Sequence, residues 1–243
     1  MATSTYKLTP KLLTSGSWPI TVTEIDVHQL DKCSLDGLFE ASTDMVVGMS
    51  AKWGPQCVLQ QLVFASRYTA VVVRLPSHKT KSRSAAQARG MSILQDTLLC
   101  NEEVKKLVFD AERVTTALYL DHRLRIANVI DMQSSALTDS RHSIAVVLVC
   151  LGGEETVVKE SVCLAFSDSR SATLSDTHRA VHRAWLTWSV TIAQSAYQSL
   201  SAVKPIDTRI LQKQASYSPI ASTSCADPAV DTPHVSETGA QRR

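Results

Sequence analysis

Short apolar runs separated by turn residues follow one another after residue 17. Residues 18–26 alternate apolar and polar side chains, which predicts a short strand. Three more strand-like runs occur at residues 44–53, 56–65 and 68–75, divided by a Gly-Pro and a Ser-Arg break. The pattern therefore predicts a meander of three neighbouring strands.

Helical and strand patterns alternate beyond the meander. Residues 91–103 have helical spacing, residues 104–110 a strand pattern, residues 111–122 a helical pattern and residues 126–131 a short strand pattern. Residues 143–153 predict a buried helix that ends at a glycine, and residues 175–200 predict one long helix beginning at Ser175 or Asp176. A meander followed by a strand–helix–strand unit predicts an α/β fold, in which helices flank a mixed sheet.

The same pattern sets the domain boundaries. Residues 1–17 are rich in Ser, Thr and Lys and predict an irregular N-terminal segment, whereas residues 18–203 predict one domain. Residues 204–243 contain four prolines and few large apolar groups. Because such a composition buries too little apolar surface to offset the entropy of ordering, we expect a disordered tail.

Composition and charge narrow the classes of partner. The 243 residues include 25 basic and 23 acidic side chains, a formal net charge of +2, so no strong overall field draws the protein to nucleic acid or to a membrane surface. The six cysteines lie far apart without a CxxC pair, which favours reduced thiols. The pattern shows neither a signal peptide nor a span of ~18 apolar residues, and we expect an intracellular protein, nuclear or cytoplasmic, without a membrane partner.

Residues 105–133, KKLVFDAERVTTALYLDHRLRIANVIDMQ, carry a family resemblance. They are similar to the second motif region of the DEDD 3′–5′ exonucleases, the family of ribonuclease D, of exosome-associated nucleases and of the Werner-type exonuclease domains. The family pattern there begins with Lys, two hydrophobic residues and His. One position that is Asp or Gly and one that is Ala or Cys come next, followed by two variable residues and an Asp. A helix and an N-hydrophobic-hydrophobic-D element follow, and residues 128–131 match this element.

Two further segments resemble the same family. VVGMSAKW, residues 46–53, is similar to the first motif, V-G-hydrophobic-D-x-E-W, and WLTWSVTIAQSAYQSL, residues 185–200, resembles the last motif, Y-A-A-x-D-A on a helix. The order of strands and helices is also that of the ribonuclease H-like fold. The resemblance covers about residues 43–200, and it implies that residues 18–203 form a 3′–5′ exonuclease-like domain with this fold.

The resemblance also implies which residues occupy the catalytic positions. Family members hold two Mg²⁺ or Mn²⁺ ions with four acidic side chains, and a Tyr orients the attacking water. The acid positions correspond to Ser50, Lys52, Val114 and Ile192, and the Tyr position corresponds to Trp188. Because none of these side chains is a carboxylate, we expect no catalytic residue, no metal ligand and no metal cofactor, with Lys52 in the place of an ion.

Several other side chains have a structural interpretation. His178 and His182 lie one turn apart on a predicted helix, but no third metal ligand accompanies them, so we expect packing or surface histidines. We expect Trp185 and Trp188 to pack against the sheet, with base stacking as the alternative. Asp131 is expected to accept hydrogen bonds at a strand end or helix start.

A basic stretch separates the third strand of the meander from the next helix. It contains no acidic residue, and such a loop either contacts phosphate groups or is simply solvated. The candidate nucleic-acid contacts are Arg74, Lys79, Lys81, Arg83 and Arg89.

Three functions are open on the sequence. The first is a catalytically inactive exonuclease-like module, associated with nucleic acid or acting as a scaffold, that weakly binds RNA or single-stranded DNA and has a protein partner. The second is an active 3′–5′ exonuclease with unusual metal ligands, drawn from Asp44, Asp110, Glu112, Asp131 and Asp176. The third is a protein-interaction module without affinity for nucleic acid.

Overall fold

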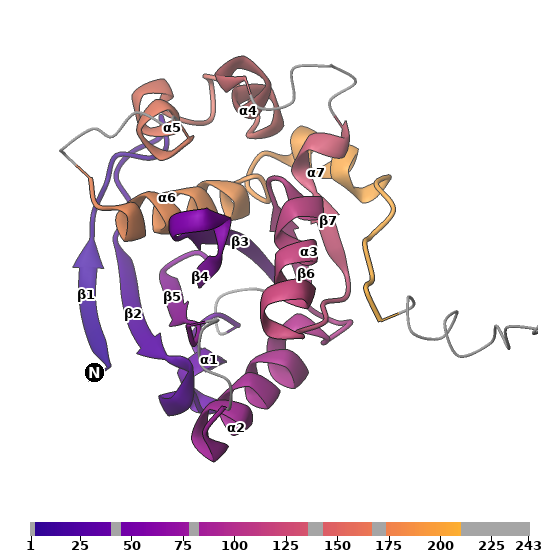
Figure 1. Cartoon of the computed structure of the whole chain (residues 1–243). Coiled ribbons are helices and arrows are strands. Elements are labelled where there is room, and N and C mark those ends of the chain that lie inside the picture. The colour runs from indigo at the N-terminus through magenta and orange to yellow at the C-terminus, as the bar shows by residue number, and fades with distance from the viewer. Residues whose placement is uncertain (1–2, 40–44, 78–82, 136–142, 167–173, 210–243) are drawn as a thin grey trace, which may run out of the picture. The chain divides into compact units, whose positions relative to one another are not determined.

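A seven-stranded mixed sheet, in the order β1–β2–β5–β4–β3–β6–β7, forms the centre of the protein (Figure 1). The computed structural model describes residues 3–39, 45–77, 83–135, 143–166 and 174–209, which belong to one compact unit. The strands are β1 (Ser4–Leu8), β2 (Ile20–Asp26), β3 (Val46–Trp53), β4 (Leu59–Ala65), β5 (Thr69–Arg74), β6 (Lys105–Val108) and β7 (Val129–Asp131). The α/β fold with a mixed sheet flanked by helices is thus confirmed.

Strand pairing follows the predicted order. Strands β3, β4 and β5 pair antiparallel as a meander, and β2 adds parallel to β5. Strand β6 pairs parallel with β3, and β7 pairs parallel with β6. Three parallel strands, β3, β6 and β7, therefore end at the same edge of the sheet, where α/β folds commonly form their ligand sites.

Seven α-helices and four shorter helical turns accompany the strands in the described part of the chain. The α-helices are α1 (Cys33–Asp36), α2 (Ala85–Leu94), α3 (Ala111–His122), α4 (Ile144–Cys150), α5 (Lys159–Phe166), α6 (Asp176–Ser189) and α7 (Gln194–Ser201). The turns are the 3₁₀ segments η1 (Val27–Gln29), η2 (Pro55–Cys57) and η4 (Met132–Ser135) and the π-helical η3 (Gln95–Leu99).

The predicted helix over residues 175–200 is two helices. Ser175 caps α6, because its hydroxyl accepts the backbone N–H of His178. At the other end, the hydroxyls of Thr187 and Ser189 donate to backbone carbonyls one turn earlier, and α6 ends at Ser189. Such side-chain bonds compete with regular helix continuation. A new helix, α7, begins at Gln194.

Two hydrophobic cores lie on the two faces of the sheet. Val46 and Val63 belong to the core that contains α4, α5 and α6, whereas Val47 and Phe64 belong to the core that contains α1, α2 and α3. Consecutive strand residues point to opposite faces, so both faces can be covered by helices. In Figure 1, α4 and α5 lie together beyond α6, and α2 lies at the opposite end of the view.

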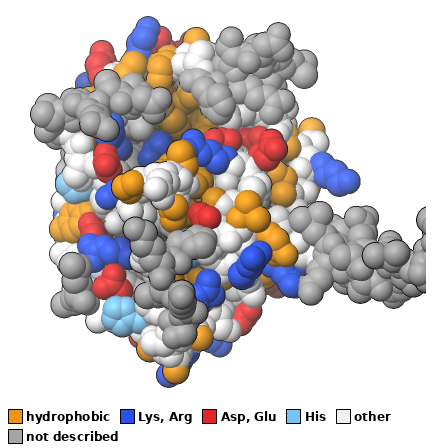
Figure 2. Space-filling model, in the orientation of Figure 1, with side chains coloured by type: hydrophobic (Ala, Val, Ile, Leu, Met, Phe, Trp, Pro, Cys, Tyr) orange, Lys and Arg blue, Asp and Glu red, His pale blue; other side chains and the backbone are white. Residues whose placement is uncertain are grey.

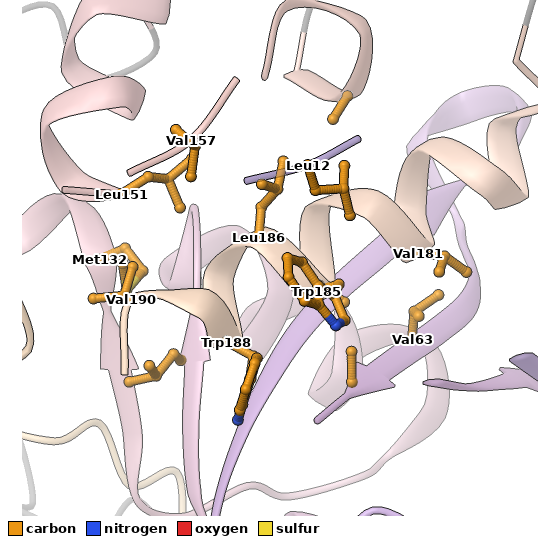
Figure 3. Packing of buried hydrophobic residues seen from close by; sticks show 14 of the residues in the cluster. Leu12, Val63, Met132, Leu151, Val157, Val181, Trp185, Leu186, Trp188 and Val190 are labelled. Carbon is orange, nitrogen blue, oxygen red and sulfur yellow. The ribbon is translucent and has the colours of Figure 1, made fainter. Parts of the chain in front are cut away.

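The described part of the N-terminal segment, residues 3–17, contains the strand β1, which corrects the prediction that the whole segment is irregular. Strand β1 pairs antiparallel with β2 at the edge of the sheet. Leu12 and Leu13 are buried, and Figure 3 shows Leu186 of α6 directed toward Leu12. Trp188 projects from the opposite side of α6, toward the strands, so this helix is buried on two sides.

The chain also remains ordered beyond residue 203. Ile206 forms an isolated bridge with Val129 along the outer side of β7, and Arg209 forms ion pairs with Asp207 and Glu102. The rest of the predicted tail, residues 210–243, lies outside the described residues. No helix in the described part of the chain is both long and apolar enough to cross a membrane.

Helix α6 and strand β3 approach each other unusually closely at Gly48. A Cβ atom at this position would lie 1.9 Å from the carbonyl oxygen of Ala184 and 2.6 Å from the backbone nitrogen of Trp188. Both are backbone atoms that cannot move aside without shifting the helix. Only glycine therefore allows α6 to lie this close to β3.

Lys106 of β6 is fully buried between the sheet and the loops that flank it. Its ammonium donates hydrogen bonds to the carbonyls of Asn101 at 2.7 Å and Ala127 at 2.8 Å. Burial lowers its pKa to about 7, because the low-dielectric interior disfavours the charged form.

We predict that Gly48→Ala lowers the free energy of unfolding by about 2 kcal/mol or more, since α6 must move away from β3. Chemical denaturation checks this. Gly37→Ala is the matched control: the added Cβ would lie 3.5 Å from the nearest atom, an ordinary contact, and should change stability little. Equal stability of the two variants would contradict the role of Gly48.

The burial of Lys106 predicts a pH dependence of stability. Its pKa is about 7 in the folded chain and 10.5 when exposed, so the unfolded chain binds more protons between these values. The free energy of unfolding should therefore rise with pH across this window, by at most about 1.4 kcal/mol per pH unit. Lys106→Met should remove this rise, as measured by denaturation at several pH values. Parallel curves for the two proteins would contradict the prediction.

Candidate functional site

A cavity of about 620 Å³ opens at the carboxyl ends of β3, β6 and β7. Its walls come from the end of β3, the start of α3, the turn after β7 and helices α4, α5 and α6. The polar residues that line it are Ser50, Asp110, Arg113, Gln133, Arg183 and Thr187, and apolar walls come from Val114, Trp53, Phe109 and Phe166 among others. The cavity has a volume typical of a small-molecule site.

Two of the residues predicted at catalytic positions meet in this cavity. Ser50 lies on β3, and its hydroxyl donates to the carbonyl of Ala180 at 2.6 Å. Val114 lies in the first turn of α3 and is almost completely buried. Neither side chain is a metal ligand of the kind that divalent cations prefer, because Val114 has no lone pair and a neutral serine hydroxyl is a weaker ligand than a carboxylate.

Trp188 and Ile192 do not line the cavity, which corrects the register expected for the last motif. Trp188 is buried in the core beside Trp185, with ring centroids 5.8 Å apart, and Ile192 lies beyond the end of α6 with 48% of its surface exposed. The predictions that Trp185 and Trp188 pack against the sheet are confirmed. Their burial excludes stacking on a base.

Two residues of α6, Arg183 and Thr187, line the cavity together with Ser50 and Val114. The guanidinium of Arg183 donates to the carbonyl of Ala51 at 3.2 Å. The sequence holds only a weak signal for Arg183, because residues 179–184, RAVHRA, match the last-motif pattern Y-A-A-x-D-A at two positions, Ala180 and Ala184.

Lys52 lies outside the cavity, near the start of α6. Its ammonium is 3.4 Å from the hydroxyl of Thr177. The pKa of the neighbouring Asp176 is lowered, chiefly by its hydrogen bond from Arg179 and further by the charges of Lys52 and Arg183. The geometry therefore does not support the expectation that Lys52 takes the place of an ion next to Val114 and Ile192.

Asp110 is the one carboxylate among the described residues that line the cavity. It adopts a left-handed backbone conformation, with φ 58° and ψ 51°, and its backbone N–H donates to the side chain of Gln133 at 3.0 Å. Its carboxylate is 4.0 Å from the guanidinium of Arg113, which lies over the ring of Trp53 at 4.3 Å from the centroid. Asp110 is thus already paired with a cation.

The other described acids among the proposed unusual ligands do not line this cavity. Glu112 faces a neighbouring surface groove on α3, and Asp176 pairs with Arg179. Asp131 accepts the backbone N–H of Gln133 and the hydroxyl of Ser134, which confirms it as a strand-end acceptor. Asp44 falls outside the described residues.

The two histidines of α6 have packing roles, as expected. His178 contacts the ring of Tyr6, with centroids 5.5 Å apart. His182 is buried, and burial together with His178 lowers its pKa to about 4, so it stays neutral at neutral pH. Within the described ranges, no three His, Cys, Asp or Glu side chains gather in a way that could hold a metal ion.

The described residues of the basic stretch do not line the cavity. Arg74 pairs with Glu24 and Asp26 at the end of β5, Arg83 donates to the carbonyl of His122 at 2.6 Å, and Arg89 is exposed on α2. Lys79 and Lys81 lie outside the described residues. On the face shown in Figure 2, basic and acidic side chains are interspersed.

The cavity does not fit the two divalent ions that the family resemblance implies. Such ions require several carboxylates that converge on one point. Here one carboxylate, Asp110, is accompanied by two guanidinium groups, those of Arg113 and Arg183. Positive charge of this density repels a cation.

Several solved structures are similar to the chain, although no family model and no curated protein matches its sequence. The exonuclease domain of Nibbler from Aedes aegypti is 12% identical, with a TM-score of 0.42, over 69% of this chain and 83% of that chain. Ribonuclease D from Trypanosoma brucei, in complex with GMP, is 13% identical, with a TM-score of 0.46, over 79% of this chain and 62% of that chain.

A third match is Escherichia coli ribonuclease D, an exoribonuclease involved in structured RNA processing, at 11% identity and a TM-score of 0.44, over 74% of this chain and 45% of that chain. The chain thus spans less than two thirds of the length of both ribonuclease D structures. These neighbours are 3′–5′ exonuclease domains, the class whose motifs the sequence resembles. The likeness is one of fold and assigns no activity.

We predict that Mg²⁺ and Mn²⁺ do not stabilise the protein after treatment with EDTA, because the cavity offers a single paired carboxylate. The melting temperature measured during a titration with each ion checks this, since a ligand that binds only the folded state raises it. A saturable rise that Asp110→Asn abolishes would contradict the prediction and would place a metal ion in the cavity.

Proposed function

We propose that this protein is a catalytically inactive 3′–5′ exonuclease-like module that acts as a nucleic-acid-associated or scaffold unit. The observation that carries the proposal is the composition of the cavity at the ends of β3, β6 and β7. Ser50, Val114 and Arg183 occupy it from three different elements, and none of them is a carboxylate.

The chemistry of phosphodiester cleavage supports this view. Metal-dependent nucleases activate a water on one ion and stabilise the leaving oxygen on the other, and both tasks need ions held by carboxylates. Arg183 can neutralise negative charge, but a guanidinium group stays protonated in proteins and cannot act as the base that removes a proton from water. The described residues that line the cavity can therefore stabilise negative charge, but none of them activates a water as a nucleophile.

An association with RNA or single-stranded DNA is the first form of the proposal, and binding to a protein partner without nucleic acid is the second. The near-neutral charge of the chain supports weak, local contacts with a strand over strong non-specific binding. If phosphate contacts carry binding, the affinity for single strands should fall as the salt concentration rises. A complete lack of binding at low salt would favour the protein-interaction form.

The digestion of 3′-labelled single-stranded RNA and DNA tests the loss of catalysis. With Mg²⁺ or Mn²⁺ present, the purified protein should leave the length of both substrates unchanged, while a metal-dependent exonuclease run in parallel shortens them. Asp110→Asn serves as the matched variant, because it removes the one carboxylate that lines the cavity. Shortening that requires the metal ion and disappears in Asp110→Asn would contradict the proposal and would favour an active nuclease with unusual ligands.

A further inference from the structure

The charge around the cavity is opposite to that of a site for divalent cations. Arg183 and Arg113 line it, and Lys52 and Arg179 lie close enough to the neighbouring Asp176 to lower its pKa. Asp110 is the acid among the described residues that line the cavity, Asp176 lies near Lys52 and Arg179, and Glu112 lies in the adjoining groove on α3. The described lining residues therefore include two guanidinium groups and one carboxylate, although the chain as a whole is nearly neutral. A concave site with an excess of positive charge attracts anions.

The two cavity arginines come from different elements and are held in place by their surroundings. Arg183 is part of the buried helix α6, and its guanidinium is anchored on the carbonyl of Ala51 at the end of β3. Arg113 is part of α3, and its guanidinium lies over the ring of Trp53, 4.3 Å from the ring centroid. Planar guanidinium groups bind phosphate oxygens with directed, charge-assisted hydrogen bonds.

The remaining walls suit a ligand larger than a free phosphate ion. Trp53 and Phe109 are aromatic, and Phe109 packs edge-on against Phe166 with centroids 4.9 Å apart. The volume of about 620 Å³ exceeds what a phosphate group fills. A flat ring next to the phosphate would therefore find apolar and aromatic surface in the same cavity.

We propose that this cavity binds a phosphate monoester directly through Arg183 and Arg113, without a divalent ion. The inference rests on the proposed function, because it assumes that the exonuclease-like site no longer holds metal ions. The phosphate belongs either to a free nucleoside monophosphate or to the terminal phosphate of a nucleic-acid strand. In both cases the arginines supply the charge that two metal ions would supply in a nuclease.

The test is a binding titration in EDTA, followed by the NMR signals of isotopically labelled full-length protein. Three probes are compared: inorganic phosphate, adenosine 5′-monophosphate, and a short RNA that ends in a phosphate, with the same RNA lacking the phosphate as its control. We expect saturable binding of adenosine 5′-monophosphate, weaker binding of inorganic phosphate, and no change in either affinity when Mg²⁺ replaces EDTA. Tighter binding of the phosphorylated RNA than of adenosine 5′-monophosphate would identify the strand terminus as the source.

Charge-conserving and charge-removing variants identify the arginines as the binding groups. Arg183→Lys should weaken binding at least about tenfold, because lysine lacks the planar pair of donors. Arg113 is about half exposed, so Arg113→Gln should fold normally and also weaken binding. Lys204→Gln removes an exposed cation outside the cavity and should leave the affinity unchanged.

Three outcomes would overturn the anion site: no saturable binding of any probe in EDTA, an affinity that increases with Mg²⁺, or an equal loss of binding in Lys204→Gln and Arg113→Gln. These outcomes are distinct from failure of the proposed function. Metal-dependent shortening of RNA would refute the inactive module, whereas a protein that neither cuts RNA nor binds phosphate would refute only the anion site.

Discussion

The close approach of α6 to β3 at Gly48 is the constraint on which the candidate site depends. Because no side chain separates the two backbones there, Ser50 can reach the carbonyl of Ala180 and Arg183 can reach the carbonyl of Ala51. Both contacts join α6 to β3 directly beside the cavity, which Ser50, Ala51 and Arg183 line. A helix held farther from the sheet would leave Arg183 outside the cavity and Ser50 without its acceptor.

The fold was largely predictable, because its signals are local. The meander and the strand–helix–strand unit follow from alternating and helical patterns that the sequence shows directly. Strand β1 was missed because it lies at the edge of the sheet with mostly exposed polar side chains, as its sequence STYKL indicates. Such a strand is stabilised by pairing with β2, which no pattern within five residues can reveal.

The site was predictable only in part, and α6 explains why. Nine of its residues are buried, on two sides of the helix, so the apolar pattern does not indicate which side faces β3. The register was therefore assigned from the tryptophans, which serve the core, and Arg183 was missed. Ser50 and Val114 line the same cavity, and their segments each match the family motif at several fixed positions.

The segment after α7 has a consequence for how molecules of this protein can meet. Ile206 pairs with Val129 on the outer side of β7, so part of this edge of the sheet is already occupied. At the opposite edge, β1 is paired on one side by β2 and exposes Ser4, Thr5 and Lys7. The outer side of β1 is thus a place where a strand of another copy could pair, and an exposed lysine on such an edge strand opposes this pairing.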